Sequence, residues 1–113
     1  MKIAISSTTQ NIEDKIDETF GRCQYFIIAE VDNGKIIKTE AIKNENVDQA
    51  TGAGISSVQL IAKQKVEAVV TGNVGPRAFD VLNQFEIKIY EGKGTVKEAI
   101  QDFIDNKLNL IKK

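Results

Sequence analysis

The chain has 113 residues, of which 42% are hydrophobic and 27% charged, and these proportions predict a single globular domain over residues 1–113 that buries its own core. Fifteen basic and sixteen acidic residues give a net charge of −1, which excludes a general electrostatic preference for nucleic acid or anionic lipid. There is no histidine and only one cysteine, so the commonest general base and metal ligand and an internal disulfide are all excluded.

The first half of the chain is predicted to contain three strands. Residues 2–6 form a short β-rich run, whereas residues 11–19 are charged and weakly patterned, with at most one helical turn. The runs 24–31 and 35–42 flank Asn33-Gly34, and Asn-Gly supplies the positive φ angles of a tight hairpin turn.

Three helices are predicted in the second half, beginning near residues 55, 76 and 95. Apolar residues recur at helical spacing after position 55, and the proline at position 76 suits the first turn of a helix. Thr95 and Glu98 have the spacing of a capping box, in which each side chain satisfies an unpaired backbone donor.

Two further strands, 67–71 and 86–90, alternate with these helices, and the tail from Asn106 is predicted to be a short extension. Strands that alternate with helices imply parallel crossover connections, hence an α/β sheet with helices on its faces. In such a sheet, ligands bind outside the carboxyl ends of the parallel strands.

Four loops should meet at this carboxyl edge, at residues 6–9, 44–54, 71–76 and 91–95. They hold six of the eight glycines, namely Gly52, Gly54, Gly72, Gly75, Gly92 and Gly94. The last three loops lead into helix amino termini, whose free N–H groups and dipole favour an anion. The sequence therefore predicts an anion-binding edge.

Both arginines lie beside loop glycines, in Gly21-Arg22 and Gly75-Pro76-Arg77. Arg77 falls in the first turn of a predicted helix, where a positive charge is mildly disfavoured. A residue type used sparingly and placed against the dipole suggests a planar, bidentate donor to an anion. The alternative is surface pairing with nearby acidic residues, namely Asp17, Glu18 and Asp80.

The single cysteine, Cys23, leaves three interpretations open. The neighbouring guanidinium could depress the pKa of the thiol and make it a thiolate metal ligand. Enclosure by nearby aromatic residues would instead make it a small part of the core, and a redox-reactive thiol is the third interpretation. Packing is favoured, because one thiolate cannot hold a conventional cluster.

The motifs FGRCQYF, TGAGI, TGNVGPRAF and GTVKEAI occur in an order that resembles the dinitrogenase iron–molybdenum cofactor biosynthesis family, over about residues 1–106. This resemblance implies a ribonuclease-H-like three-layer fold with helices on both faces of a five-stranded mixed sheet, of order 3-2-1-4-5 with an antiparallel second strand. The residue pattern alone does not fix the direction of the strand at 24–31.

For function, the resemblance implies binding and transfer of iron–sulfur or iron–molybdenum clusters rather than catalysis. A negatively charged cluster suits helix amino termini, glycine backbone and arginines. Carried over by position, the candidates are Arg22, Cys23, Asn73, Gly75 and Arg77. The alternative is a small regulatory or interaction module that binds a phosphate-bearing anion at the same edge.

We expect a cytoplasmic protein, because the amino-terminal residues lack the apolar run of a signal peptide and no later stretch could span a bilayer. Metallocofactor-assembly proteins are the expected partners, without nucleic acid or membrane, and the chain is expected to be a monomer or weak homodimer. The acidic residues between 13 and 18 are predicted to form a solvated turn rather than a metal site.

Overall fold

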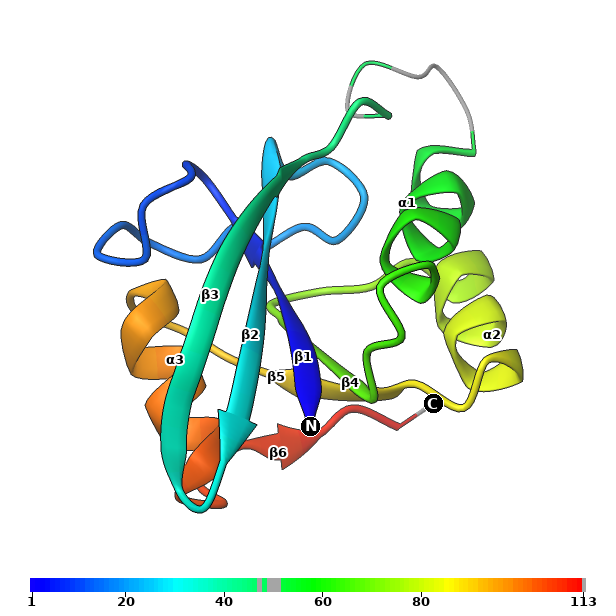
Figure 1. The fold of residues 1–113 in the computed structure, drawn as a ribbon. Helices are drawn as coiled ribbons and strands as arrows, with labels where there is room; N and C mark the ends of the chain where they lie inside the picture. Colours follow the sequence, from blue (N-terminus) through cyan, green and yellow to red (C-terminus); the bar gives the residue numbers. More distant parts are fainter. Residues whose placement is uncertain (47, 49–51, 113) are drawn as a thin grey trace.

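Six strands form one mixed sheet in the computed structural model, which describes residues 1–46, 48 and 52–112 (Figure 1). The strands are β1 (Lys2–Ser7), β2 (Tyr25–Asp32), β3 (Lys35–Lys43), β4 (Ala68–Thr71), β5 (Lys88–Glu91) and β6 (Asn109–Leu110). Their order across the sheet is β3-β2-β1-β4-β5-β6, and β2 and β6 run against the other four strands. The order and directions of the first five strands match those that the family resemblance implies.

The prediction of five strands is wrong by one, because β6 pairs antiparallel with the outer edge of β5. Leu110 lies opposite Tyr90, and Asn109 lies opposite Glu91. The chain turns after α3 through Asn106, which has a positive φ of 57°. A strand of two residues is too short for an alternating pattern to be recognised, so only a short extension was predicted for this segment.

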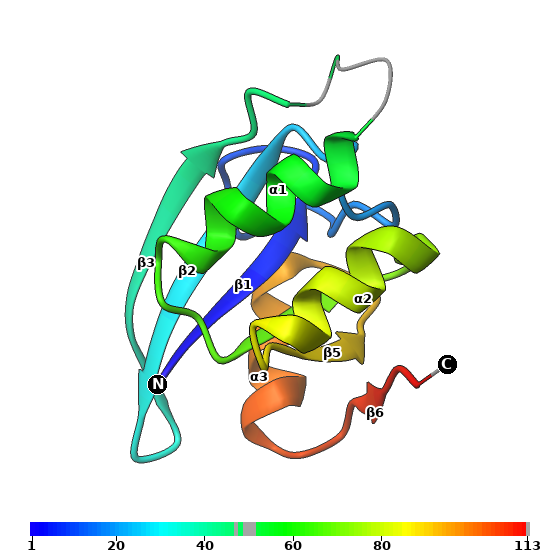
Figure 2. The same cartoon turned by 90° about the vertical axis from the view of Figure 1, so that its right-hand side faces the viewer.

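Three helices, α1 (Ala53–Ala62), α2 (Pro76–Gln84) and α3 (Val96–Ile104), begin within two residues of their predicted positions. α1 and α2 cover one face of the sheet and α3 covers the other (Figure 2). None of the helices in the described ranges is long and apolar enough to cross a membrane.

Two apolar layers result, one on each face of the sheet. On the first, Val58 and Leu82 of the two helices pack with Phe26 of β2, and all three side chains are fully buried. On the second, Ile100 of α3 packs with Ile5 of β1. The central strands of the sheet are thus buried on both sides, as expected for an α/β protein, whereas the edge strand β3 is largely exposed.

The hairpin between β2 and β3 turns at the end of the sheet away from the carboxyl end of β1 (Figure 1). Asn33 and Gly34 both have positive φ, of 51° and 74°, which confirms the predicted tight turn. Because β2 runs against β1, β2 begins at the edge where β1 and β4 end. Residues 19–24, here called the Arg22 loop, therefore reach the predicted binding edge.

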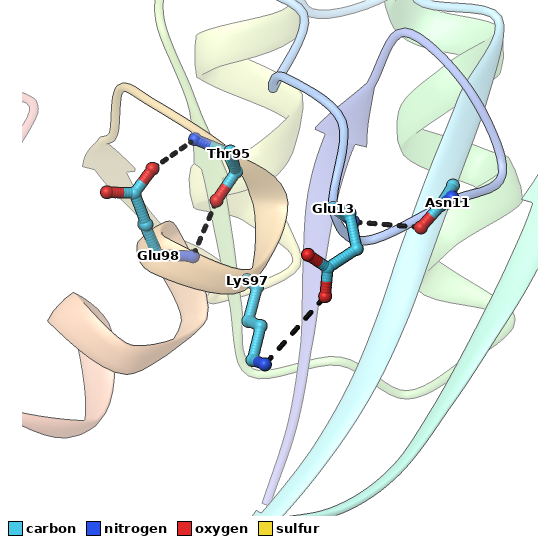
Figure 3. Close-up of polar contacts among 5 residues, drawn as sticks. All are labelled: Asn11, Glu13, Thr95, Lys97 and Glu98. Atoms are coloured by element: carbon cyan, nitrogen blue, oxygen red, sulfur yellow. Dashed lines mark hydrogen bonds and ion pairs between the residues drawn. The ribbon is translucent and has the colours of Figure 1, made fainter.

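The predicted capping box at the start of α3 is present (Figure 3). The Thr95 hydroxyl accepts a hydrogen bond from the Glu98 N–H at 3.1 Å, and the Glu98 carboxylate accepts one from the Thr95 N–H at 3.0 Å. The pKa of Glu98 is lowered from its ordinary value. The main cause is the hydrogen bond from the Thr95 backbone, and the hydrogen bond with the Thr95 side chain contributes less.

We expect Thr95→Ala to lower the free energy of unfolding by about 0.5–2 kcal/mol, because the Glu98 N–H loses its acceptor. Urea titration at neutral pH measures this loss. Glu98→Gln is the matched control, since glutamine keeps an acceptor oxygen for the Thr95 N–H and should lose less. Equal losses in the two variants would show that the hydroxyl does not cap the helix.

Candidate functional site

A pocket of about 480 Å³ lies at the edge of the sheet where β1 and β4 end. Its walls come from three stretches of chain: residues 19–22, residues 52–55 at the start of α1, and residues 73 and 75–78 at the start of α2. Six predicted site residues come together here, namely Arg22, Gly52, Gly54, Asn73, Gly75 and Arg77.

A second pocket, of about 450 Å³, lies at the other end of the sheet beside the Asn33–Gly34 turn. Among the described residues that line it, none is a lysine or an arginine, and Asp32 contributes an acidic side chain. The first pocket, which both arginines line, is therefore the better candidate for an anion than the second.

The amino termini of α1 and α2 supply unpaired donors to the first pocket. Their N-cap residues, Gly52 and Gly75, have no side chain that could cap the helix. The N–H groups of residues 53–55 and 77–78 have no hydrogen-bond acceptor within the described part of the chain. Two helix ends with free donors and positive dipole ends face the same space, which is the arrangement that binds anions.

Small residues let these three stretches approach one another closely. Gly21 has a φ of +94°, and a Cβ there would lie only 2.9 Å from the Cα of Gly54. A Cβ on Gly54 would lie 3.1 Å from the Cβ of Ala78, at the start of α2. A side chain at position 21 would therefore push the Arg22 loop away from α1 and widen the pocket.

The two arginines lie on different walls of the pocket, and both side chains are exposed. The backbone N–H of Arg22 donates to the carbonyl of Thr19 at 3.3 Å, which closes a turn in the loop. Arg77 and Asp80 are both described by the structure and form no ion pair with each other. The surface-pairing interpretation therefore does not hold for Arg77.

Gly72 does not line the pocket but supports it. A Cβ at position 72 would lie 2.8 Å from the backbone of Glu18, so only glycine lets the chain before the Arg22 loop lie against the end of β4. The contact continues one residue on, where the N–H of Phe20 donates to the carbonyl of Asn73 at 3.0 Å.

Gly92 and Gly94, predicted to join the same site, lie elsewhere. The start of α3 has no donor to offer, because the N–H groups of Val96 and Lys97 donate to carbonyls of residues 14 and 12 at 2.9 Å and that of Glu98 is capped. Lys97 also pairs with Glu13 at 3.8 Å (Figure 3). The segment predicted to be a solvated acidic turn thus covers this helix end and excludes an anion from it.

Cys23 is fully buried in the core cluster beneath α1 and α2, although Arg22 beside it is exposed. Burial raises the pKa of its thiol to about 12, well above the ordinary value of 9.0. It does not line the pocket, and no group of three or more acidic, histidine or cysteine side chains among the described residues could hold a metal. The structure favours packing over metal ligation or redox reactivity.

We expect the Cys23 thiol to react slowly with a disulfide reagent at pH 8 in the native protein and rapidly after unfolding in urea. Because its pKa is raised in the folded state, its contribution to stability is complete below about pH 9 and is lost as the pH rises toward 12. Urea midpoints of the wild type should therefore fall more steeply over this range than those of Cys23→Ala. Parallel pH profiles would contradict the burial of the thiol.

Asn44 is a buried polar residue that the sequence analysis did not select. It lies between two exposed charged residues, Lys43 and Glu45, so nothing in the local pattern indicates burial. Its side chain nevertheless bonds to the backbone on either side of Arg22.

Comparison with known proteins places this chain among relatives of similar sequence and fold. A sequence profile described as dinitrogenase iron-molybdenum cofactor matches residues 1–106. An uncharacterised protein of Methanocaldococcus jannaschii is 36% identical over 109 residues, which cover 96% of this chain and 89% of the relative.

Two solved structures extend this likeness to the backbone. The apo form of the orange protein from Desulfovibrio gigas superposes with a TM-score of 0.90 at 29% identity, covering 97% of this chain and 92% of that protein. A Thermotoga protein provisionally named a NifB protein gives 0.82 at 33% identity, covering 96% and 91% of the two chains.

Proposed function

The chain belongs to the dinitrogenase iron–molybdenum cofactor family, and from this premise we propose that it is a non-catalytic carrier of an anionic iron–sulfur or iron–molybdenum-type cluster in metallocofactor assembly. One observation carries the proposal. Two arginines and two uncapped helix amino termini meet around a pocket that has no acidic side chain among its described lining residues. Such a pocket attracts an anion. Its described lining residues include no carboxylate, histidine or cysteine, the side chains that most often act as a general acid or base.

The pocket would hold the cluster by charge and hydrogen bonds rather than through protein ligands. No cysteine, histidine or carboxylate is among its described lining residues, and Cys23 is buried away from it. The cluster must then arrive with its coordination complete, so that only its outer atoms meet the N–H groups and guanidinium groups. A group held in this way can be passed on without breaking a metal–protein bond, which suits a carrier.

One relative supports the proposal that the protein binds a cofactor. The orange protein of Desulfovibrio gigas was described in an apo form, a term for a protein without a group that it binds. Proteins that supply and receive the cluster are the proposed partners, in a reducing cytoplasm, with the chain as a monomer or weak homodimer.

We also propose a ribonuclease-H-like classification, supported by the order of the first five strands and the reversed β2.

A phosphate-bearing anion is the second candidate ligand. The same donors, helix N–H groups and arginines, are those that bind phosphate in proteins, and the pocket provides no sulfur ligand that would favour a metal. In this case the protein would be a regulatory or interaction module.

Anaerobic reconstitution tests the proposal. The wild type is mixed with a preformed iron–sulfur cluster bearing small thiol ligands, or with iron and sulfide, and is then desalted. We expect visible absorbance to elute with the wild type and not with the Arg22→Ala/Arg77→Ala double variant.

Two results would count against the carrier proposal. Equal colour on the wild type and the double variant would mean adsorption outside the pocket. A colourless wild type whose amide resonances at residues 53–55 and 77–78 shift with added phosphate would favour the second candidate.

A further inference from the structure

The Asn44 side chain bonds to the backbone on both sides of Arg22. Its amide nitrogen donates to the carbonyl of Cys23 at 2.9 Å and to that of Gly21 at 3.3 Å. The side chain is fully buried, so both N–H groups are used inside the protein. The carbonyls on either side of Arg22 are thereby turned inward, while the Arg22 side chain is exposed at the pocket.

The other end of the same amide connects to α1. Its carbonyl oxygen lies 3.4 Å from the hydroxyl of Ser57, which donates to it, and 3.1 Å from the N–H of Asn46. The Asn44 backbone N–H donates to the carbonyl of Gln24 at 2.9 Å. Asn44 therefore links the end of β3, the Arg22 loop and α1, whose amino terminus forms another wall of the pocket.

The conformation of the loop makes this link necessary. Gly21 is held at a φ of +94° against Gly54, and its carbonyl lies in buried surroundings. Without Asn44 two buried carbonyl groups would lose a donor, and leaving such groups unsatisfied is more costly than a hydrogen bond is favourable. The loop would rearrange to reach water, and Arg22 would move with it.

We propose that Asn44 is a positioning residue that orders Arg22 for anion binding without itself touching the anion. This inference rests on the proposed function of the pocket. Asn44→Ala should leave a folded protein whose Arg22 loop is mobile. Part of the binding free energy is then spent on the entropy cost of ordering that loop. A loss of about 2- to 10-fold in affinity follows from the usual cost of immobilising one long side chain.

A double-mutant cycle separates positioning from general destabilisation. The affinity for the preformed iron–sulfur cluster with small thiol ligands is measured anaerobically, well below the unfolding temperature. In an Arg22→Ala background, Asn44→Ala should weaken binding by less than about twofold, because the residue through which it acts is gone. In an Arg77→Ala background, the full loss should remain. Equal losses in both backgrounds would overturn the inference.

A second measurement does not depend on the ligand. Backbone order parameters of residues 21–23 should fall from about 0.85 to below about 0.6 in Asn44→Ala, while those of α3 stay unchanged. Ser57→Ala is the matched control, since it removes a contact of Asn44 with α1 and leaves both bonds to the Arg22 loop.

The two measurements also keep failures distinct. A wild type that binds no cluster contradicts the proposed function, and the order parameters then decide for or against the positioning role. If Asn44→Ala does not fold, Asn44→Ser replaces it in both measurements, because a serine hydroxyl has one donor and leaves at least one of the two carbonyls without a hydrogen bond. Unchanged order at residues 21–23 would overturn the inference whatever the affinities.

Discussion

Removing both arginines should lower the affinity for an anionic iron–sulfur cluster by about 10²- to 10⁴-fold. Hydrogen bonds to charged groups contribute about 1.5–3 kcal/mol each, which is about 10- to 150-fold for each arginine. Arg22 and Arg77 come from different walls of the pocket, so their contributions should nearly add. Anaerobic titration of the two single variants and the double variant at fixed salt measures these losses.

Lysine variants separate charge from geometry. Arg22→Lys and Arg77→Lys keep the positive charge but lose the planar fork, so their affinities should lie between the wild type and the alanine variants. Cys23→Ala should bind nearly as well as the wild type, because its thiol is buried away from the pocket. Loss of binding in Cys23→Ala alone, with normal binding in the arginine variants, would establish direct thiolate ligation instead.

Phe26→Ala should lower the free energy of unfolding by about 3–5 kcal/mol, the range for deleting a fully buried phenylalanine. Its side chain has no exposed surface, and its ring centroid lies 5.4 Å from that of Phe20. Phe20 also lines the pocket, so the cavity left by Phe26 lies next to the floor of the binding site. Guanidinium titration measures the loss in stability, and the cluster affinity should fall as well.

Phe85→Ala is the control of the same chemical type. Phe85 is 53% exposed at the end of α2, so its removal should change the stability by less than about 0.5 kcal/mol. Phe103 lies between these cases, because it is only partly buried against the second core layer. Similar losses for Phe26 and Phe85 would contradict the described core.

The parts of the fold that depend on short-range signals could be predicted from the sequence. The turn at Asn33–Gly34, the start of α2 at its proline and the capping box of α3 each follow from residues a few positions apart. The direction of β2 could not be predicted in this way, because the apolar pattern of a strand is the same whether it runs parallel or antiparallel to its neighbour. The direction was predicted from the family resemblance. β6 was missed because its existence depends on the free edge of β5.

The binding site shows the same division. Glycine loops before the helices predicted that the amino termini of α1, α2 and α3 would all contribute, and only those of α1 and α2 line the pocket. The α3 terminus has an equally suitable glycine loop, but the carbonyls of residues 12 and 14 occupy its donors. Neither that contact nor the burial of Asn44 can be recognised from the neighbouring sequence, because each depends on chain segments that only the tertiary fold brings together.

The approach of α1 and α2 at Gly54 and Ala78 has a consequence for the stability of the protein when no ligand is bound. The two helices lie side by side with their amino ends together, so like partial charges, reinforced by two guanidinium groups, repel one another there (Figure 2). An anion relieves this repulsion, and any ligand that binds only the folded state raises its stability by mass action. The protein should therefore be least stable without a bound anion, and sulfate should raise the melting temperature of the wild type more than that of the double arginine variant.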